Sequence, residues 1–271
     1  MATQRNGSNG NGTPKLSFRN VVKSFEGERQ NTLALSGFDL DVYPSEFVCL
    51  VGPSGCGKTT ALNLAAGFIR PDSGHVLLDG KPIERPGPDR AMVFQEHALF
   101  PWMTVRKNLE FALEMIKKPK TERTIVTNFY LKLVHLDAFA DSYIHELSGG
   151  MKQRVQIARS LALAPAVYLM DEPFAALDAL TRDELYDEIQ RILAQTKQTV
   201  LFITHNIREA VILGDRVVVM GGAQPGRIRS DFTVDLPRPR SFESPGVSDL
   251  ISKTMAVLKA EPGAAEESLH G

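Results

Sequence analysis

Residues 52–59 read Gly52-Pro53-Ser54-Gly55-Cys56-Gly57-Lys58-Thr59. An apolar run, 47–51, precedes them and a helix-like stretch, 60–66, follows, so the order is strand, glycine-rich loop, helix. The pattern is G-x-x-x-x-G-K-[ST], in which small residues let the backbone wrap an anion and point its N–H groups at phosphate oxygens. A glycine-rich turn can be purely structural, but this lysine and threonine favour a phosphate loop. Lys58 would then neutralise the β- and γ-phosphates, and Thr59 would place its hydroxyl on Mg²⁺.

The bulk composition is that of an ordinary globular protein. The chain has 271 residues, of which 43% are hydrophobic and 23% charged, and its formal net charge of −1 provides no basic field for nucleic acid. Its two cysteines, Cys49 and Cys56, make no disulfide framework and suit a reducing compartment. We find no metal-ligand spacing of Cys or His, and no run approaches the roughly 18 apolar residues of a membrane span. These features indicate a cytosolic protein, which could still dock on a membrane protein.

The chain alternates between two kinds of strand pattern, with a helical insertion between them. Residues 1–14 predict a disordered tail, and alternating patterns at 16–21 and 38–43, with a further strand at 75–78, predict a small antiparallel layer. A helical pattern in which Ile125, Phe129, Leu133 and Leu136 recur predicts an inserted helical subdomain at about 96–160, closed by a helix over 150–164.

After the insertion, the pattern is typical of an α/β protein with a parallel sheet. Buried strands are expected at 167–170, 200–203 and 216–220, separated by helices. The main domain is expected to span residues 15–235. Residues 236–271 are interpreted as a C-terminal tail, in which Val247, Leu250, Ile251, Met255 and Leu258 predict a short amphipathic helix.

Two acids, Asp171 and Glu172, directly follow the strand expected at 167–170. Ligands of parallel α/β sheets bind at the carboxyl ends of strands, so both carboxylates are expected at the same edge as the phosphate loop. Asp171 suits a Mg²⁺ ion that keeps several of its waters, and Glu172 can polarise an attacking water. Two acids can also form a plain solvated strand end, but their position after a phosphate loop favours the catalytic interpretation.

A second anion cradle is expected at Leu147-Ser148-Gly149-Gly150-Met151, just before a helix. A serine and two glycines at a helix N-terminus offer backbone N–H groups and a hydroxyl to an anion. The same residues could serve only as an ordinary N-cap.

With these motifs in hand, the chain resembles the ATP-binding subunit of an ABC transporter. Such subunits combine the phosphate loop with an LSGG signature, a D-E-P strand end, an L-D turn and a single histidine, and residues 15–235 carry these elements in the family order. The resemblance implies a P-loop NTPase (RecA-like) α/β core with an antiparallel β subdomain and an inserted helical subdomain. Residues 85–90 and 172–182 further resemble the nitrate, sulfonate and taurine importer branch.

The resemblance also implies roles for individual residues. Phe25 would stack on adenine, Glu172 would be the general base, His205 would contact the γ-phosphate, and Asp178 would bridge to a partner subunit. The catalytic set is Glu172, His205, Lys58 and Gln95. Mg²⁺ would be held by Thr59, Gln95 and Asp171. Nucleotide contacts are expected from Phe25, Gly52, Pro53, Ser54, Gly55, Cys56, Gly57, Lys58, Thr59, Thr60, Gln95, Asp178 and His205, and from Ser148, Gly149 and Gly150 of the opposite subunit.

Two departures from the family pattern concern single residues. Met151 stands where glutamine is common, which leaves the groups that would meet phosphate intact, and Phe25 stands where tyrosine is frequent. Alone, Gln95, His205 and Phe25 could each have only a structural role; their shared order favours the family roles.

The implied cofactors are ATP and Mg²⁺, and the implied partners surround the chain in a transporter. They are a second ATPase subunit, which is a copy or a close relative, and transmembrane permease subunits, with a periplasmic or extracellular solute-binding protein involved indirectly. The chain would lie on the cytoplasmic face of the membrane. The aromatic stretch 97–105 could simply pack the helical insert or could receive a permease helix.

Two other function classes are compatible with a phosphate loop. An ABC ATPase that acts on nucleic acid or the ribosome would be expected to have long arms with a heptad repeat, a basic face or two ATPase cassettes in one chain. The sequence shows none of these features. A small-molecule kinase would have no use for residues 147–151.

Overall fold

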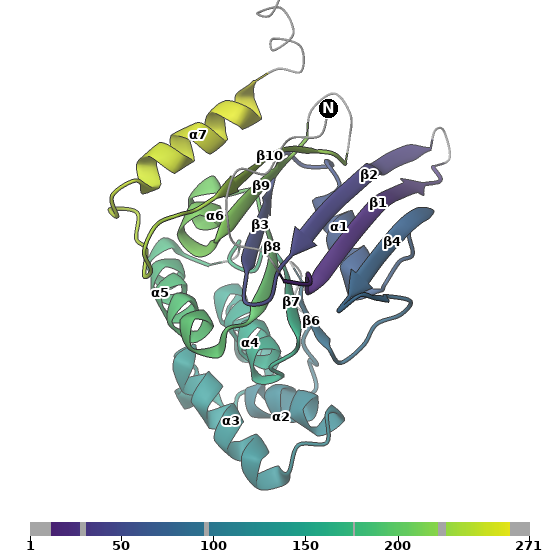
Figure 1. Ribbon diagram of the computed structural model, residues 1–271. Coiled ribbons are helices and arrows are strands. Elements are labelled where there is room, and N and C mark those ends of the chain that lie inside the picture. The colour runs from purple at the N-terminus through teal and green to yellow at the C-terminus, as the bar shows by residue number, and fades with distance from the viewer. Residues whose placement is uncertain (1–11, 28–30, 95–97, 176, 222–225, 261–271) are drawn as a thin grey trace, which may run out of the picture.

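The structure is a computed structural model that describes residues 12–27, 31–94, 98–175, 177–221 and 226–260. It contains an antiparallel sheet in the order β2-β1-β4-β5 and a mostly parallel sheet in the order β10-β9-β3-β8-β7-β6 (Figure 1). The strands of the first sheet are β1 Leu16–Phe25, β2 Thr32–Val42, β4 Ser73–Leu78 and β5 Lys81–Pro82. Those of the second are β3 Phe47–Val51, β6 Arg90–Val93, β7 Val167–Asp171, β8 Thr199–Thr204, β9 Arg216–Met220 and β10 Ile228–Thr233. Together with its helices, this arrangement confirms the predicted α/β class.

The central sheet is covered on both faces, which explains its continuous apolar strands. Every residue of β3, β7 and β8 is buried. Successive side chains of a strand point to opposite faces, and those of β3 accordingly divide between two cores: Val48 and Leu50 join one, and Phe47, Cys49 and Val51 join the other. Only β10, at one edge, runs antiparallel to its neighbour.

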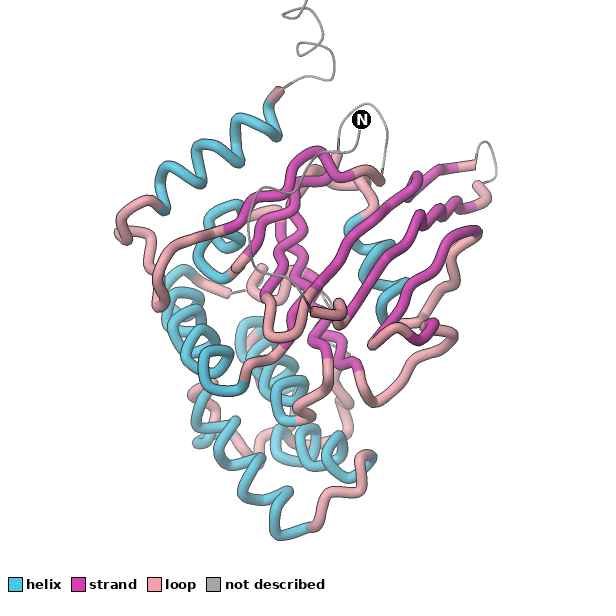
Figure 2. Tube along the Cα trace, viewed as in Figure 1, coloured by secondary structure: helices cyan, strands magenta, loops and turns pink. Residues whose placement is uncertain are grey.

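Helix α1, Lys58–Ala66, lies in the core between the two sheets, because its side chains share a cluster with β1, β2 and one face of the central sheet. The other face is covered by α5 Ala179–Thr196, α6 Ile207–Leu213 and α7 Val247–Lys259. Figure 2 shows the remaining helices gathered at one end of the molecule, away from the antiparallel strands. They are α2 Val105–Met115, α3 Lys120–Leu133 and α4 Gly149–Ala162, with 3₁₀ turns at Asp137–Phe139 and Ile144–Glu146. No helix in the described ranges is long and apolar enough to cross a membrane.

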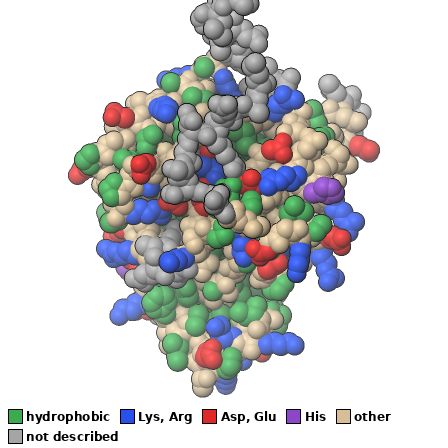
Figure 3. Space-filling view, viewed as in Figure 1, with side chains coloured by type: hydrophobic (Ala, Val, Ile, Leu, Met, Phe, Trp, Pro, Cys, Tyr) green, Lys and Arg blue, Asp and Glu red, His purple; other side chains and the backbone are tan. Residues whose placement is uncertain are grey.

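The apolar stripe that predicted α3 is not its buried face. Ile125 and Phe129 are 68% and 58% exposed, whereas Thr127 and Leu131 are buried. Leu136 is buried but lies beyond the end of the helix. Figure 3 shows hydrophobic side chains gathered over this helical end of the molecule.

Residues 236–241 are bound to the core by Arg240. Its side chain is buried and donates hydrogen bonds to backbone carbonyls of Val211, Gly214, Val234 and Leu236. Gln190 exchanges two hydrogen bonds, of 2.9 and 2.8 Å, with the backbone of Arg240. Burial lowers the pKa of Arg240 to about 10, so the guanidinium stays charged at neutral pH.

Candidate active site

The phosphate loop is held between β2 and the end of β9, and this close approach explains two of its glycines. A Cβ on Gly57 would lie 2.4 Å from the carbonyl oxygen of Ala34 in β2, and the φ angle of Gly57 is +100°. A Cβ on Gly52 would lie 2.5 Å from the carbonyl oxygen of Met220 in β9. Since a side chain fits at neither position, only glycine lets the loop lie this close to the two strands.

Helix α1 begins at Lys58 without any side-chain cap. The helices α2, α4 and α6, by contrast, are capped by the side chains of Thr104, Ser148 and Asn206. The first N–H groups of a helix have no partner inside the helix, and its N-terminus carries partial positive charge. An uncapped start next to a glycine-rich loop is therefore suited to bind phosphate.

Lys58 lies inside this loop. Its Nζ donates to the carbonyl oxygens of Gly52 and Pro53, at 2.8 and 2.9 Å, and lies 3.7 Å from Cys56 Sγ. The side chain is buried. The ammonium group is thus already enclosed by the loop that would hold the phosphates.

Asp171 ends β7 beside the start of α1. Burial is the main cause that raises the pKa of its carboxyl, and the negative charge of Glu172 raises it further. A hydrogen bond from the Thr59 hydroxyl and the positive charge of Lys58 lower this pKa, but the net shift is upward. The Thr59 hydroxyl and the Asp171 carboxylate are hard oxygen donors in contact, and Mg²⁺ prefers few protein ligands of this kind. The residues therefore fit Mg²⁺, which Thr59 and Asp171 would hold together.

The next residue, Glu172, adopts a left-handed backbone with φ +46°. A residue with a Cβ adopts this conformation only at a cost, and such strain concentrates at functional sites. Its N–H donates to the carbonyl of Ile203 in β8 at 3.0 Å, which ties the turn to the neighbouring strand. One carboxylate oxygen lies 2.9 Å from Nδ1 of His205, which follows β8. The ends of adjacent strands therefore bring together the predicted base and the predicted histidine.

The second cradle lies at the start of α4 and is exposed at Ser148 and Gly149. Ser148 caps α4 by accepting a hydrogen bond from the Met151 N–H at 3.3 Å, so the helix begins at Gly149, one residue before the predicted start. It ends at Ala162 rather than Ala164, because Ala164 has a left-handed backbone, with φ +45°. Ser148 and Gly149 are exposed, and a Cβ on Gly149 would have nothing within 4 Å. Among the described residues, no hydrogen bond or ion pair joins 147–151 to the phosphate loop.

Comparison with known proteins agrees with this geometry. The family model described as ABC transporter matches residues 35–175. The chain belongs to the ABC transporter family of ATPases. An uncharacterised ABC transporter ATP-binding protein of Methanocaldococcus jannaschii is 49% identical over 247 residues, which cover 91% of this chain and 92% of that protein.

Two further relatives come from an importer and from a solved cassette. The nitrate import ATP-binding protein NrtC of Synechococcus elongatus is 44% identical over 235 residues, which cover 84% of this chain and 36% of that longer protein. The solved structure of a dimeric ATP-binding cassette, in a post-hydrolysis state with ADP and Pi, is 30% identical with a TM-score of 0.72. It covers 82% of this chain and is itself covered completely. The predicted P-loop NTPase fold and ATPase class are thereby confirmed.

Two other residues of the predicted ABC site lie at the surface. Phe25 ends β1, is 43% exposed, and has the Lys23 ammonium 5.6 Å from its ring centroid. Asp178 accepts a hydrogen bond from the Thr181 N–H at 3.0 Å at the start of α5, and this contact lowers the pKa of Asp178. Asp178 thus has a local capping role whatever its role toward a partner. Gln95 lies outside the described residues.

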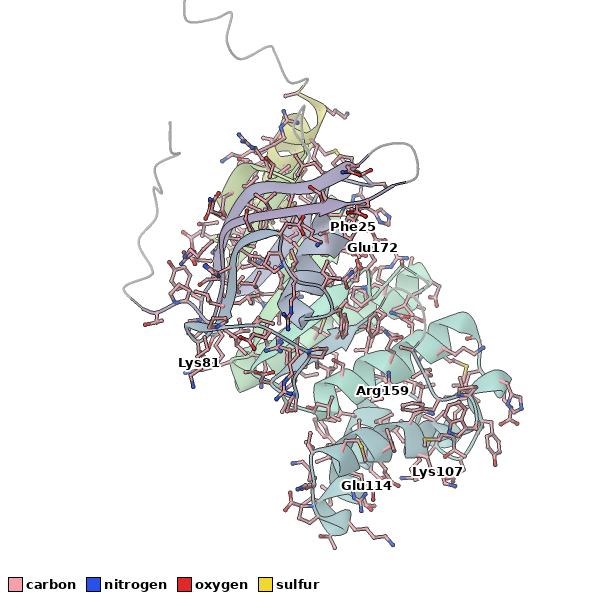
Figure 4. The ribbon with its side chains drawn as sticks, turned by 90° about the vertical axis from the view of Figure 1, so that its right-hand side faces the viewer. Phe25, Lys81, Lys107, Glu114, Arg159 and Glu172 are labelled. Atoms are coloured by element: carbon pink, nitrogen blue, oxygen red, sulfur yellow. The ribbon has the colours of Figure 1, made fainter. Side chains whose placement is uncertain are left out.

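A groove of about 320 Å³ lies where the ABC core meets its helical end. Its lining includes Phe68, Phe94, Phe100 and Phe111, together with Arg90 and Arg159. Figure 4 places Arg159 at this junction. The described part of the aromatic stretch expected at 97–105 therefore contributes a wall of a groove.

Sequence reasoning missed the buried residues that support His205. Thr204 and Glu209 flank it closely in sequence and are hydrogen-bonded to each other, at 2.6 Å. The signal in the sequence was that the run 207–213 is apolar except for Arg208 and Glu209. That pattern indicates a buried charge but does not reveal its partner.

Proposed function

We propose that this chain is the ATP-hydrolysing subunit of an ABC importer, and that two copies, or one copy and a close relative, close around two ATP molecules. The observation that carries the proposal is the contact between Glu172 and His205 at the end of the phosphate-binding sheet. The other oxygen of Glu172 would then accept a proton from water, next to Asp171 at the end of β7.

The chain's residues divide the work of hydrolysis. The phosphate-loop N–H groups and Lys58 bind the β- and γ-phosphates and offset their charge. A water oxygen attacks the γ-phosphorus in line, the bond to the β-phosphate oxygen breaks, and Glu172 takes the proton of the water. His205, held on the other oxygen of Glu172, contacts the γ-phosphate. Thr59, Asp171 and Gln95 would hold Mg²⁺, which would supply further positive charge at the phosphates.

A second subunit would complete the site. Ser148 and Gly149 are exposed and Gly150 is partly exposed, which suits contact with ATP bound by another chain. Phe25 would stack on adenine, and Asp178 would lie at the interface of the two subunits. ATP binding would close the pair, and hydrolysis would reopen it.

The groove between the core and the helical end is the proposed docking site of a permease helix. Its aromatic walls offer apolar burial, and the guanidinium groups of Arg90 and Arg159 add hydrogen-bond donors. The chain would thereby be held at the cytoplasmic face of the membrane. The similarity to NrtC supports import of a small anion, such as nitrate, a sulfonate or taurine, delivered by a solute-binding protein.

The Glu172→Gln variant tests the catalytic proposal. The amide retains a contact with His205 but cannot accept the proton, so we expect kcat to fall by about a hundredfold or more while the Kd for ATP stays within about twofold. With ATP and Mg²⁺ the variant should also elute as a stable dimer in size-exclusion chromatography. Near-normal steady-state hydrolysis would remove Glu172 from the role of base.

Ser148→Arg tests the shared site. It should block hydrolysis without weakening ATP binding to the monomer, because Ser148 would serve the other chain's nucleotide. Weaker binding by the monomer would instead place Ser148 in its own subunit's site. The solute is tested by co-purifying the permease subunits and measuring ATPase activity in liposomes with each candidate anion and its binding protein.

A further inference from the structure

A buried carboxylate, Glu209 in α6, has no cationic partner among the described residues. Its side chain is 4% exposed, and none of the ion pairs of the described chain includes it. It accepts two hydroxyl hydrogen bonds instead: Tyr186 donates to one oxygen at 2.7 Å and Thr204 to the other at 2.6 Å. Burying a carboxylate is costly unless it is well hydrogen-bonded, and bonds to a charged acceptor are the stronger kind. Both hydroxyls are therefore firmly fixed.

Thr204 connects the buried carboxylate to the backbone on both sides of His205. It is the last residue of β8 and is 1% exposed. While its hydroxyl donates to Glu209, the same oxygen accepts the N–H of Asn206 at 2.9 Å. Asn206 in turn caps α6 by accepting the Arg208 N–H at 3.0 Å. The residues before and after His205 are thus tied to one buried carboxylate.

The imidazole of His205 has little support of its own. Its side chain is 68% exposed, and its contact with Glu172 is the one hydrogen bond that the described chain makes to its ring. An exposed ring on a fixed backbone takes its direction mainly from that backbone. The buried network fixes the backbone from which the imidazole reaches Glu172.

Tyr186 of α5 links the network to the turn that carries Glu172. Its ring packs edge-on against Phe174, two residues after Glu172, with centroids 5.2 Å apart. Burial, followed by the negative charge of Glu209, raises the pKa of Tyr186, so the phenol keeps the proton that it donates. Tyr186 thus contacts both Glu209, in the network next to His205, and Phe174, in the turn that carries Glu172.

We propose that Glu209, Thr204 and Tyr186 are positioning residues for the reaction: they hold the turn from which His205 reaches Glu172. This inference rests on the proposed function of Glu172 and His205 as the catalytic pair. All three side chains are buried, so none of them would touch the nucleotide. Their loss should therefore change the rate of hydrolysis and leave ATP binding intact.

The test compares two substitutions of one threonine with a control elsewhere. Thr204→Val keeps the shape and removes the hydroxyl, whereas Thr204→Ser keeps the hydroxyl. Thr254→Val in α7 is the matched control, since Thr254 is also 1% exposed and loses a single bond, of 2.8 Å, to the Leu250 carbonyl. We expect Thr204→Val to lower kcat about tenfold with an unchanged Kd for ATP, and Thr204→Ser and Thr254→Val to stay within about twofold of the parent chain.

A second readout follows the imidazole directly. The NMR signal of the His205 ring, assigned by its loss in His205→Ala, should shift in Thr204→Val and Tyr186→Phe and stay in place in Thr254→Val. Tyr186→Phe keeps the aromatic packing, so it tests the network even if Thr204→Val folds poorly. The NMR arm needs no turnover: a parent chain without ATPase activity would refute the proposed function and still leave this linkage to be measured.

Two results would overturn the proposal. One is a kcat for Thr204→Val equal to that of Thr254→Val at matched melting temperatures. The other is a His205 signal that does not move in either network variant, which would mean that the buried carboxylate only stabilises the fold.

Discussion

Replacing Gly149 by alanine should separate the stability of this chain from its catalysis. Gly149 is the first residue of α4, is exposed, and would have nothing within 4 Å of an added Cβ. Its φ lies outside the left-handed region, so alanine fits the backbone. Glycine in a helix costs about 0.5 to 1 kcal/mol relative to alanine, and a position at the helix end should give the lower part of that range. We therefore expect the melting temperature to rise by about 1 to 2 °C.

The same methyl group should impair hydrolysis. In the proposed dimer, the backbone of Gly149 would lie against the phosphates of ATP bound by the other subunit, and an added methyl group would displace them. Displacing reacting groups by about 1 Å can cost about a hundredfold in rate. We expect kcat to fall by that order, and binding of ATP to the monomer to stay unchanged.

The assay measures melting by calorimetry and steady-state ATPase activity over a range of protein concentrations. The matched control is Ser252→Ala at an exposed position of α7, where the gain in helix propensity is about 0.5 kcal/mol and no catalytic effect is expected. A higher melting temperature with unchanged kcat would refute the contact between this segment and nucleotide. A lower melting temperature would refute the open space around Gly149.

Three other substitutions test how the site is supported. Asn108→Leu removes the side-chain amide that bonds the backbone N–H and carbonyl of Phe100, at 2.9 and 3.2 Å. We expect the free energy of unfolding to fall by about 2 kcal/mol. Calorimetry should show a melting temperature lower by about 4 to 8 °C. Gly57→Ala places a methyl 2.4 Å from a backbone oxygen of β2 at a φ of +100°, so ATP binding measured by fluorescence should be lost together with stability. Hydrogen bonds from the Lys23 ammonium and, second, from the N–H of residue 24 lower the pKa of Asp72 below its ordinary value of 3.8. The stability that Asp72 contributes is therefore present above pH 3.8 and is lost as the pH falls through the folded pKa. Melting curves of Asp72→Asn and of the parent chain should converge at low pH.

The phosphate loop could be predicted because its chemistry is local. Only glycine meets the constraints set by the φ angle of Gly57 and by the close approach of Met220 to Gly52. These constraints therefore appear in the sequence as fixed glycines within eight consecutive residues. The buried strands were predictable for a similar reason. A strand covered on both faces must be apolar throughout, as 167–170 and 200–203 are.

Contacts across the fold left no such mark. The position of β3 between β8 and β9 follows from pairing that no single strand encodes. Periodicity predicted the helix around Ile125 and Phe129, but the two side chains are exposed, because the space beneath α3 is filled by Thr127 and Leu131. The hydroxyl partners of Glu209 come from positions 186 and 204, and only the folded chain brings them together.

The catalytic end of the sheet combines buried supports with exposed working groups. Asp171 and Thr204, which end neighbouring strands, are buried and hydrogen-bonded, whereas His205 projects into solvent. An exposed group can meet a nucleotide and a second subunit, but it keeps a defined direction only if its backbone cannot move. The strained turn at Glu172 has the same requirement, since a left-handed residue persists only where its surroundings hold it. Variants of Thr204 should therefore alter catalysis more than they alter ATP binding, and variants at the exposed cradle around Gly149 should alter catalysis without loss of stability.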